Sequence, residues 1–192
     1  MDQRAAAVEK TRGQILQAAY ELFLAEQYED VTLERVAERA GVSKQTVIRQ
    51  FGSKDQLAYA VVDWQRPHEE AARTAEPGEM AAAVAVLVGR YERMGDANVR
   101  VLALEDRVPA IGYLLEQGRD SHRQWIERVF APYLPKFRGA AYERRVMAFY
   151  AATEVMTWKL LRRDFKLGRK QTQAVLLELV SSLAAQTRET GD

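Results

Sequence analysis

The fold of this chain is decided by the stretch Leu33-Glu-Arg-Val-Ala37-Glu-Arg-Ala-Gly41-Val-Ser43-Lys-Gln-Thr-Val47-Ile-Arg-Gln-Phe51. Two helices that cross steeply over a short turn need a small residue where they touch, and Ala37 provides one. Gly41 follows at the place where the first helix must end in a left-handed conformation. Ser43 then stands where a side-chain oxygen would cap the second helix. The spacing predicts a helix-turn-helix.

The residues of this stretch divide into an inward set and an outward set. The apolar side chains that are spaced to fill a small core are Val36, Ala40, Val42, Val47 and Phe51. The outward set consists of residue types that hydrogen-bond base edges and phosphates, namely Ser43, Lys44, Gln45, Thr46, Arg49 and Gln50. No acidic residue occurs between Gly41 and Lys54, although the whole chain has a formal net charge of only +1. The stretch therefore predicts DNA binding, with two short helices packed on a larger body as the structural alternative.

Apolar residues recur at helical spacing along the rest of the chain, and this pattern predicts an all-α fold. Thr11 resembles the start of a capped helix, and Pro67 is expected to kink or end the helix that opens at Ser53. Further along we expect helices at about 79–94, 97–107, 109–131, 140–165 and 169–188. We expect a three-helix helix-turn-helix domain over residues 1–56. A helical bundle for ligand binding and dimerisation would follow over residues 57–192.

The first quarter of the chain resembles the TetR family of transcriptional regulators. The matching residues are Thr32, Val36, Ala37, Ala40, Gly41, Val42, Ser43, Thr46, Phe51, Lys54 and Leu57. The remainder is similar to the family only in length and helical character. The resemblance implies a homodimeric repressor that binds double-stranded DNA at an inverted-repeat operator. It also implies that a small-molecule effector releases the DNA.

The resemblance further implies roles for single residues of the DNA-binding set. Lys44 and Gln45 would contact bases, because recognition helices usually present their N-terminal turns to the major groove. Thr32 and Lys54 would contact phosphates at helix N-termini. For a flexible N-terminal arm with Arg4, Lys10 and Arg12 two interpretations stay open: the arm adds further DNA contacts, or it is merely a solvated basic segment.

Ile48 departs from the family pattern, since the family frequently has tyrosine at this position. A tyrosine there can reach a phosphate, whereas an isoleucine cannot. Three interpretations stay open: the phosphate contact is missing, Ile48 meets a thymine methyl group, or Ile48 packs inward.

An effector site is predicted from an irregular apolar stripe in the helix that follows Pro109. Gly118 and His122 fall on this stripe, and a missing side chain beside an imidazole is typical of a small-molecule site. A core histidine bonded to a neighbour, with Gly118 admitting a close helix crossing, is the alternative. The candidate effector residues are Trp64, Tyr91, Met94, Tyr113, Gly118, His122, Trp125, Phe149 and Thr153.

The last two predicted helices are apolar over more than one face, which indicates burial on both sides. In a chain of 192 residues one of these sides is best covered by a partner subunit, giving a four-helix interface. The candidate interface residues are Trp158, Leu161, Val175, Leu176, Leu179, Val180 and Leu183.

The composition argues against several other classes of protein. The chain contains no cysteine and only two histidines, and it lacks a His-Glu-x-x-His motif, a glycine-rich phosphate loop and a Gly-x-Ser-x-Gly motif. We therefore expect no enzyme, no metal site and no cofactor. No apolar run approaches the roughly 20 residues that span a bilayer, so we expect a cytoplasmic protein without membrane contact. The alternative function is an all-α homodimer that binds DNA or another protein without a small-molecule effector.

Overall fold

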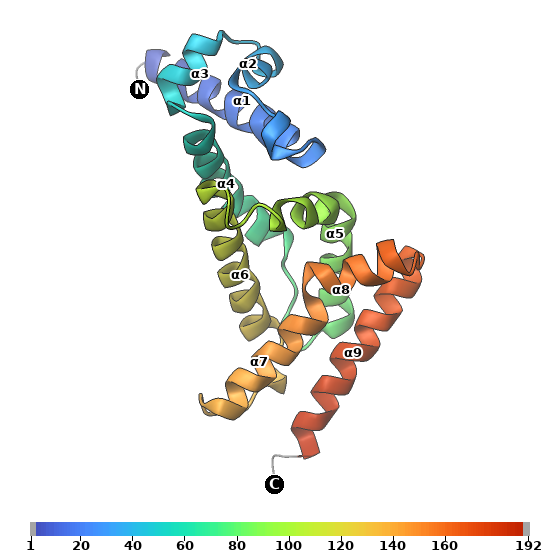
Figure 1. The fold of residues 1–192 in the computed structure, drawn as a ribbon. Helices are drawn as coiled ribbons and strands as arrows, with labels where there is room; N and C mark the ends of the chain where they lie inside the picture. Colours follow the sequence, from blue (N-terminus) through green and yellow to red (C-terminus); the bar gives the residue numbers. More distant parts are fainter. Residues whose placement is uncertain (1–2, 190–192) are drawn as a thin grey trace. The chain divides into compact units, whose positions relative to one another are not determined.

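The computed structural model describes residues 3–189, apart from the side chains of residues 3, 4, 70 and 186–189. This part of the chain is helical and contains no strand, which confirms the all-α prediction. No helix within it is both long and apolar enough to cross a membrane. The helices (Figure 1) are α1 Gln3–Ala25, η1 Tyr28–Asp30, α2 Leu33–Ala40, α3 Lys44–Phe51, α4 Lys54–Ala72, α5 Met80–Leu102, α6 Pro109–Val129, η2 Ala131–Tyr133, α7 Ala140–Thr153, α8 Val155–Lys159, the π-helix η3 Leu160–Asp164 and α9 Arg169–Glu189.

The chain divides into two compact units. The first contains residues 1–69 and 100–116, and the second contains residues 70–99 and 117–192. The first unit therefore combines the three N-terminal helices with most of α4 and with the corner between α5 and α6. This division differs from the expected boundary after residue 56, because residues far along the chain pack with the helix-turn-helix.

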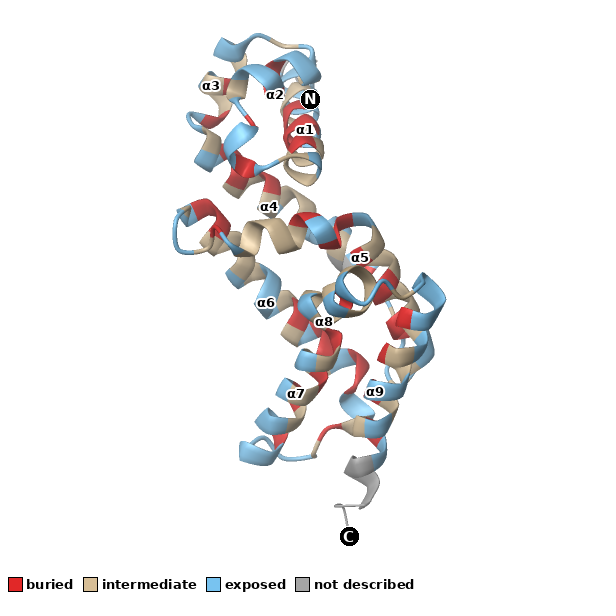
Figure 2. Cartoon of the chain, turned by 45° about the vertical axis from the view of Figure 1, so that its right-hand side comes forward, coloured by how far each residue is buried: buried red, intermediate tan, exposed pale blue. Residues whose placement is uncertain are grey.

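The helix-turn-helix of the first unit forms as its local chemistry predicts. The hydroxyl of Thr32 accepts a hydrogen bond from the backbone N–H of Arg35 and caps α2. Gly41 ends α2 with a left-handed φ of 68°, and Ser43 caps α3. Buried residues line the inward faces of α1, α2 and α3 (Figure 2), and their main members are Ile15, Ala19, Leu22, Val36, Ala37, Val47 and Phe51.

Helix α1 begins well before Thr11, so the predicted capped start at that residue was wrong. Thr11 lies in the helix interior, where its hydroxyl donates to the carbonyl of Ala7 over 2.9 Å. The three alanines at positions 5–7 have a high helix propensity, which accounts for the longer helix.

A second cluster of the first unit joins η1 to later helices. Tyr28 is buried there with Ala58, Leu104 and Ile111. The guanidinium of Arg100 donates to the carbonyl of Leu24 over 2.5 Å, near the C-terminal end of α1. Such a contact satisfies one of the carbonyls that a helix end leaves without an intrahelical partner.

Helix α4 continues through Pro67 to Ala72, so of the two expectations for Pro67 the end of the helix does not occur. Helix α5 runs without interruption through Gly95-Asp96, where a boundary between two helices was expected. Gly95 is buried in α5, and Trp158 packs directly against it. The glycine therefore serves close packing rather than the end of a helix.

In the second unit the expected helix over residues 140–165 is broken after Thr153. Glu154 has an extended backbone, and its carboxylate accepts a hydrogen bond of 2.7 Å from the N–H of Met156 to cap α8. The hydroxyl of Tyr91 donates to the carbonyl of Thr153 over 2.9 Å. These side chains satisfy backbone groups that the break frees, which explains why the helix can end at this point.

Candidate nucleic-acid interface

The recognition helix α3 is held in place by two buried side chains, Val47 and Phe51. Arg12 of α1 lies over the Phe51 ring, with its guanidinium carbon 4.6 Å from the ring centre. The opposite side of α3 carries the predicted DNA-binding residues: Ser43, Lys44, Gln45 and Arg49 are exposed, and Thr46 and Gln50 are partly exposed. The side chain of Arg4 lies outside the described residues. The buried side chains thus anchor α3 on the core, and its polar side is exposed.

Ser43 and Thr46 are bonded to each other at the start of α3. The Ser43 hydroxyl accepts a hydrogen bond from the N–H of Thr46 over 3.1 Å, and the two hydroxyl oxygens are 2.9 Å apart. Both hydroxyls therefore contribute to the helix cap, which fixes the first turn of the helix that carries Lys44 and Gln45.

Lys44 forms an ion pair with Glu34 of α2. Both side chains are largely exposed, at 49% for Lys44 and 57% for Glu34. The hydrogen bond from the Lys44 ammonium lowers the pKa of the Glu34 carboxyl below its ordinary value. A positive group in the first turn of α3 thus lies beside a negative group in the first turn of α2.

Thr32 and Lys54, the predicted phosphate contacts, both have structural partners. The hydroxyl of Thr32 accepts the cap bond of α2. The ammonium of Lys54 donates to the carbonyls of Tyr28 and Glu29, over 2.9 Å and 3.4 Å, and lies 4.4 Å from the centre of the Tyr28 ring. Lys54 therefore secures η1 through its ammonium group. Ile48 is partly exposed.

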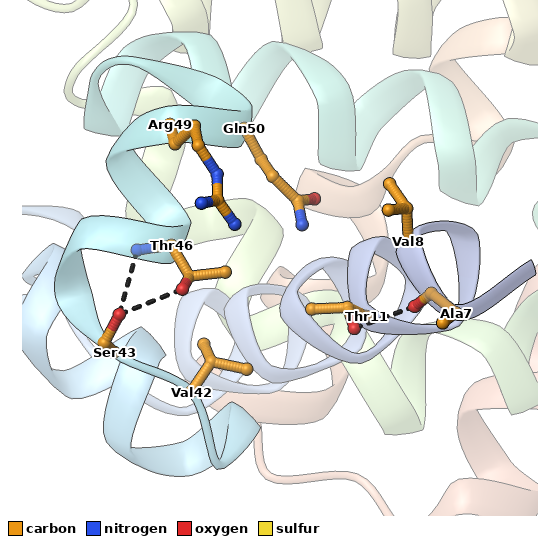
Figure 3. Close-up of a pocket in the computed structure, with 8 residues that line it drawn as sticks. All are labelled: Ala7, Val8, Thr11, Val42, Ser43, Thr46, Arg49 and Gln50. Atoms are coloured by element: carbon orange, nitrogen blue, oxygen red, sulfur yellow. Dashed lines mark hydrogen bonds between the residues drawn. The ribbon is translucent and has the colours of Figure 1, made fainter. Parts of the chain in front are cut away.

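A groove of about 380 Å³ lies between α3 and the N-terminal part of α1 (Figure 3). The lining residues are Ala7, Val8, Thr11, Val42, Ser43, Thr46, Arg49 and Gln50. The amide oxygen of Gln50 is buried and has no hydrogen-bond partner among the described residues. Sequence reasoning missed Ala7 and Val8, because it placed the start of α1 at Thr11. The alanine run before Val8 was the available signal.

The other arginines of the helix-turn-helix are neutralised by acidic residues. Arg35 of α2 pairs with Glu26, and Arg39 pairs with Glu21 over 2.6 Å. Within the described part of the chain Arg49 has no carboxylate partner. On α3, Arg49 is therefore the positive charge that no carboxylate compensates.

A family model for the bacterial regulatory proteins of the tetR family matches residues 15–61, which include α2 and α3 but not Ala7, Val8 and Thr11 of the groove. The N-terminal part of the chain is thus similar to this family. The transcriptional regulator TcmR of Streptomyces glaucescens is 45% identical over 49 residues, which are 26% of this chain and 22% of that protein. The regulator SrpR of Pseudomonas putida is 40% identical over 58 residues, which are 30% of this chain and 27% of that protein. The match thus spans about a quarter of either relative.

Solved structures show the same fold for nearly the whole chain. A TetR-family regulator from Streptomyces coelicolor matches with a TM-score of 0.73 at 18% identity, over 93% of this chain and 85% of that one. A transcriptional regulator from Rhodococcus sp. matches with a TM-score of 0.69 at 14% identity, over 91% of this chain and 96% of that one.

Part of the predicted effector set lies together in a buried cluster of the second unit. Arg73 donates to Nδ1 of His122 over 2.5 Å, and Nε2 of His122 lies 3.1 Å from the hydroxyl oxygen of Thr153. That hydroxyl donates onward to the carbonyl of Phe149 over 2.6 Å. Because arginine only donates, Nε2 must carry the imidazole proton. Burial, followed by the charge of Arg73, holds the pKa of His122 well below its ordinary value.

The aromatic side chains around this cluster include two further predicted residues. Trp125 stacks on the His122 ring, and its indole N–H donates to the carbonyl of Arg73 over 2.9 Å. Tyr91 is bonded to the carbonyl of Thr153. Sequence reasoning missed Arg73 and Tyr150, whose ring meets the His122 ring edge-on. No motif in the sequence distinguishes this arginine from the exposed ones.

The remaining candidate effector residues lie elsewhere. Trp64 and Tyr113 belong to the first unit, where the Tyr113 hydroxyl donates to Asp63 over 3.1 Å. Met94 is buried in the second unit. Gly118 is exposed, and no atom lies within 4 Å of the position that a Cβ would take. The space predicted beside His122 is thus open solvent at Gly118. Within the described residues no group of three or more acidic or histidine side chains could hold a metal ion.

The candidate dimer residues differ in exposure. Trp158, Leu176 and Val180 are buried in the core of this chain itself. Leu161, Val175 and Leu183 are half-buried, and Leu179 is 41% exposed. The other exposed large apolar residues of α7, α8, η3 and the segment that follows are Met147, Met156, Leu160 and Phe165.

Proposed function

We propose that this chain is a homodimeric repressor that binds an inverted-repeat operator and releases it when a small molecule binds to the second unit. The proposal rests on α3, which two buried side chains hold while Lys44, Gln45 and Arg49 face outward. An exposed helix with this polar composition fits the major groove, whose base edges carry the sequence information. As a transcriptional regulator of the bacterial type, the protein would act in the cytoplasm.

Dimerisation is supported by the exposed apolar side chains of the C-terminal helices. Met147, Met156, Leu160, Phe165 and Leu179 account for most of the large apolar side chains that are exposed among the described residues. Exposed apolar side chains that gather on consecutive elements are the kind of surface that a partner covers. A second copy of the chain offers the same surface, and a two-fold axis would present two recognition helices to two half-sites.

Control by an effector is supported by the buried polar cluster around His122. A core that contains a guanidinium, an imidazole and a hydroxyl group offers hydrogen-bonding groups that an apolar core would lack. An effector with its own polar groups would compete for these bonds and alter the packing of α6 against the break after Thr153. A coupling free energy of about 1–3 kcal/mol would change DNA affinity roughly 5- to 150-fold.

The dimeric repressor is tested by measuring its oligomeric state and its footprint on DNA. Analytical ultracentrifugation should show a dimer that Leu179→Glu weakens, and hydroxyl-radical footprinting of selected genomic fragments should show protection with dyad symmetry. A monomeric protein, or a footprint without symmetry, would contradict the dimeric account.

The effector is tested separately, by screening small molecules for release of the bound fragment. A compound that releases the wild type but not His122→Ala would place the effector at this cluster. A compound that releases both proteins equally would remove the cluster from the account. If no compound releases DNA, the account reduces to a DNA-binding homodimer without an effector.

A further inference from the structure

Lys44 forms an ion pair with Glu34, and a lysine that contacts phosphate would not need such a carboxylate partner. Lys44 begins the recognition helix α3, and Glu34 lies in the first turn of α2. Both side chains are about half exposed or more, so the pair contributes little to folding stability. Its location on the DNA-facing elements therefore calls for an explanation in terms of recognition.

The net charge of the pair argues against a role in binding the DNA backbone. A lysine that contacts phosphate acts through its positive charge and the counterions that it displaces. Beside Lys44 the carboxylate of Glu34 cancels this charge and would itself repel a phosphate. Arg49, which has no carboxylate partner within the described part of the chain, is the better phosphate contact of α3.

The hydrogen-bonding capacity of the pair remains largely unused. An ammonium group has three donors and a carboxylate has about four acceptor positions, so the mutual bond leaves donors on Lys44 and acceptors on Glu34. In the major groove a G·C pair presents two adjacent acceptors, N7 and O6 of guanine, followed by a donor, the N4 amino group of cytosine. An A·T pair places its donor between two acceptors and adds a methyl group.

We infer that Lys44 and Glu34 together read one G·C base pair in each half-site. The Lys44 ammonium donates to N7 and O6 of guanine, and the Glu34 carboxylate accepts from N4 of cytosine. Glu34 is thus a specificity-determining residue, and the ion pair positions both side chains before the protein binds DNA. This inference rests on the proposed DNA-binding function and adds to it the base pair that the first turns of α2 and α3 select.

The experiment begins with selection of duplexes from a random pool by the wild-type protein. The preferred site is then varied one base pair at a time, and each dissociation constant is measured for wild type, Lys44→Met and Glu34→Met. Both variants should lose about tenfold of discrimination at the same G·C pair of each half-site, and neither should change the preference at other positions. Thermal unfolding checks that the variants, which alter exposed side chains, remain folded.

Two base analogues test the same contacts without changing the protein. N4-methylcytosine at the critical pair should weaken binding of the wild type and leave Glu34→Met almost unaffected. 7-Deazaguanine should likewise weaken the wild type more than it weakens Lys44→Met. These analogues remove single groups of the base edge, so a structural role of the ion pair would not reproduce their pattern.

Glu38→Met and Arg49→Met are the matched controls for loss of charge. Glu38 is an exposed carboxylate on α2, and its removal should raise affinity for all duplexes alike. Arg49→Met should weaken binding to all duplexes alike and reduce the salt slope by about one. If Glu34→Met behaves as Glu38→Met does and keeps the base preference, the inference is overturned while the proposed function stands. If the wild type selects no sequence, both are overturned.

Discussion

The Cβ that an alanine would place on Gly95 lies 2.4 Å from Cζ3 of Trp158, closer than real Cβ atoms approach another heavy atom. Trp158 is fully buried, and its indole N–H donates to the Glu92 carboxylate over 3.1 Å, so the ring has little freedom to move away. We expect Gly95→Ala to lower the free energy of unfolding by about 1–3 kcal/mol through overpacking.

Gly118→Ala is the matched control for this substitution. Gly118 also lies in a helix, but nothing is within 4 Å of its Cβ position. Alanine there should raise stability by up to about 1 kcal/mol, because it favours the helix. Urea unfolding of both variants distinguishes the sites, and equal effects would mean that Trp158 does not pack on Gly95 in this way.

Gly41 lies where the turn between α2 and α3 requires a left-handed backbone, with φ of 68°. No atom lies within 4 Å of its Cβ position, so Gly41→Ala would act through backbone conformation alone. We expect a loss of about 1–2 kcal/mol in the free energy of unfolding. Gly13→Ala, in the regular helix α1 with equally open space, should be neutral or stabilising when both are compared by thermal melting. A harmless Gly41→Ala would show that this turn is not built as described.

Lys54 and Lys44 should separate stability from DNA binding. Lys54→Met removes an ammonium that bonds the carbonyls of Tyr28 and Glu29, and we expect it to cost about 1 kcal/mol of stability after allowance for partial exposure. Lys44→Met removes only an exposed ion pair and should leave the unfolding curve almost unchanged while altering base preference. Chemical unfolding and DNA titration of both variants check this. An unchanged unfolding curve for Lys54→Met would favour a phosphate contact for Lys54 over a structural role.

His122 should make stability depend on pH in the mildly acidic range. Burial, then the charge of Arg73, lowers its pKa in the folded protein well below the ordinary value of 6.5. Below about pH 6.5 the unfolded chain takes up a proton that the folded chain excludes, so stability falls as the pH is lowered, by at most about 1.4 kcal/mol per pH unit. Unfolding measured from pH 7.5 to 5 should show a shallower decline for His122→Gln. Parallel declines would indicate that His122 is protonated in the folded protein.

The helix-turn-helix was predictable because the chemistry that forms it is local. Thr32 and Ser43 bond to groups within their own first turns, and the left-handed conformation at Gly41 is a property of one residue. The outward set of α3 followed from the same helical spacing. The start of α1 was missed because a plausible cap at Thr11 was weighed above the alanine run before it.

The second unit was harder to predict because its helix boundaries depend on distant partners. Gly95 resembles a helix end until Trp158 is known to pack against it, and the break after Thr153 depends on a hydroxyl group from Tyr91. His122 was identified from its place on an apolar stripe. Arg73, which bonds to it, precedes it by 49 residues in the sequence and lies in a polar stretch. Such contacts between distant residues leave no periodic signal in the sequence.

The most direct test of the central claim is a fluorescence-anisotropy titration of the full chain with its selected duplex and with a scrambled duplex, across a range of salt concentrations. We expect the chain to bind the selected duplex in preference to the scrambled one, with an affinity that falls steeply as salt rises and a smaller salt slope for Arg49→Met. Failure of the folded wild type to bind either duplex at low salt would contradict the assignment of α3 as a DNA-recognition helix.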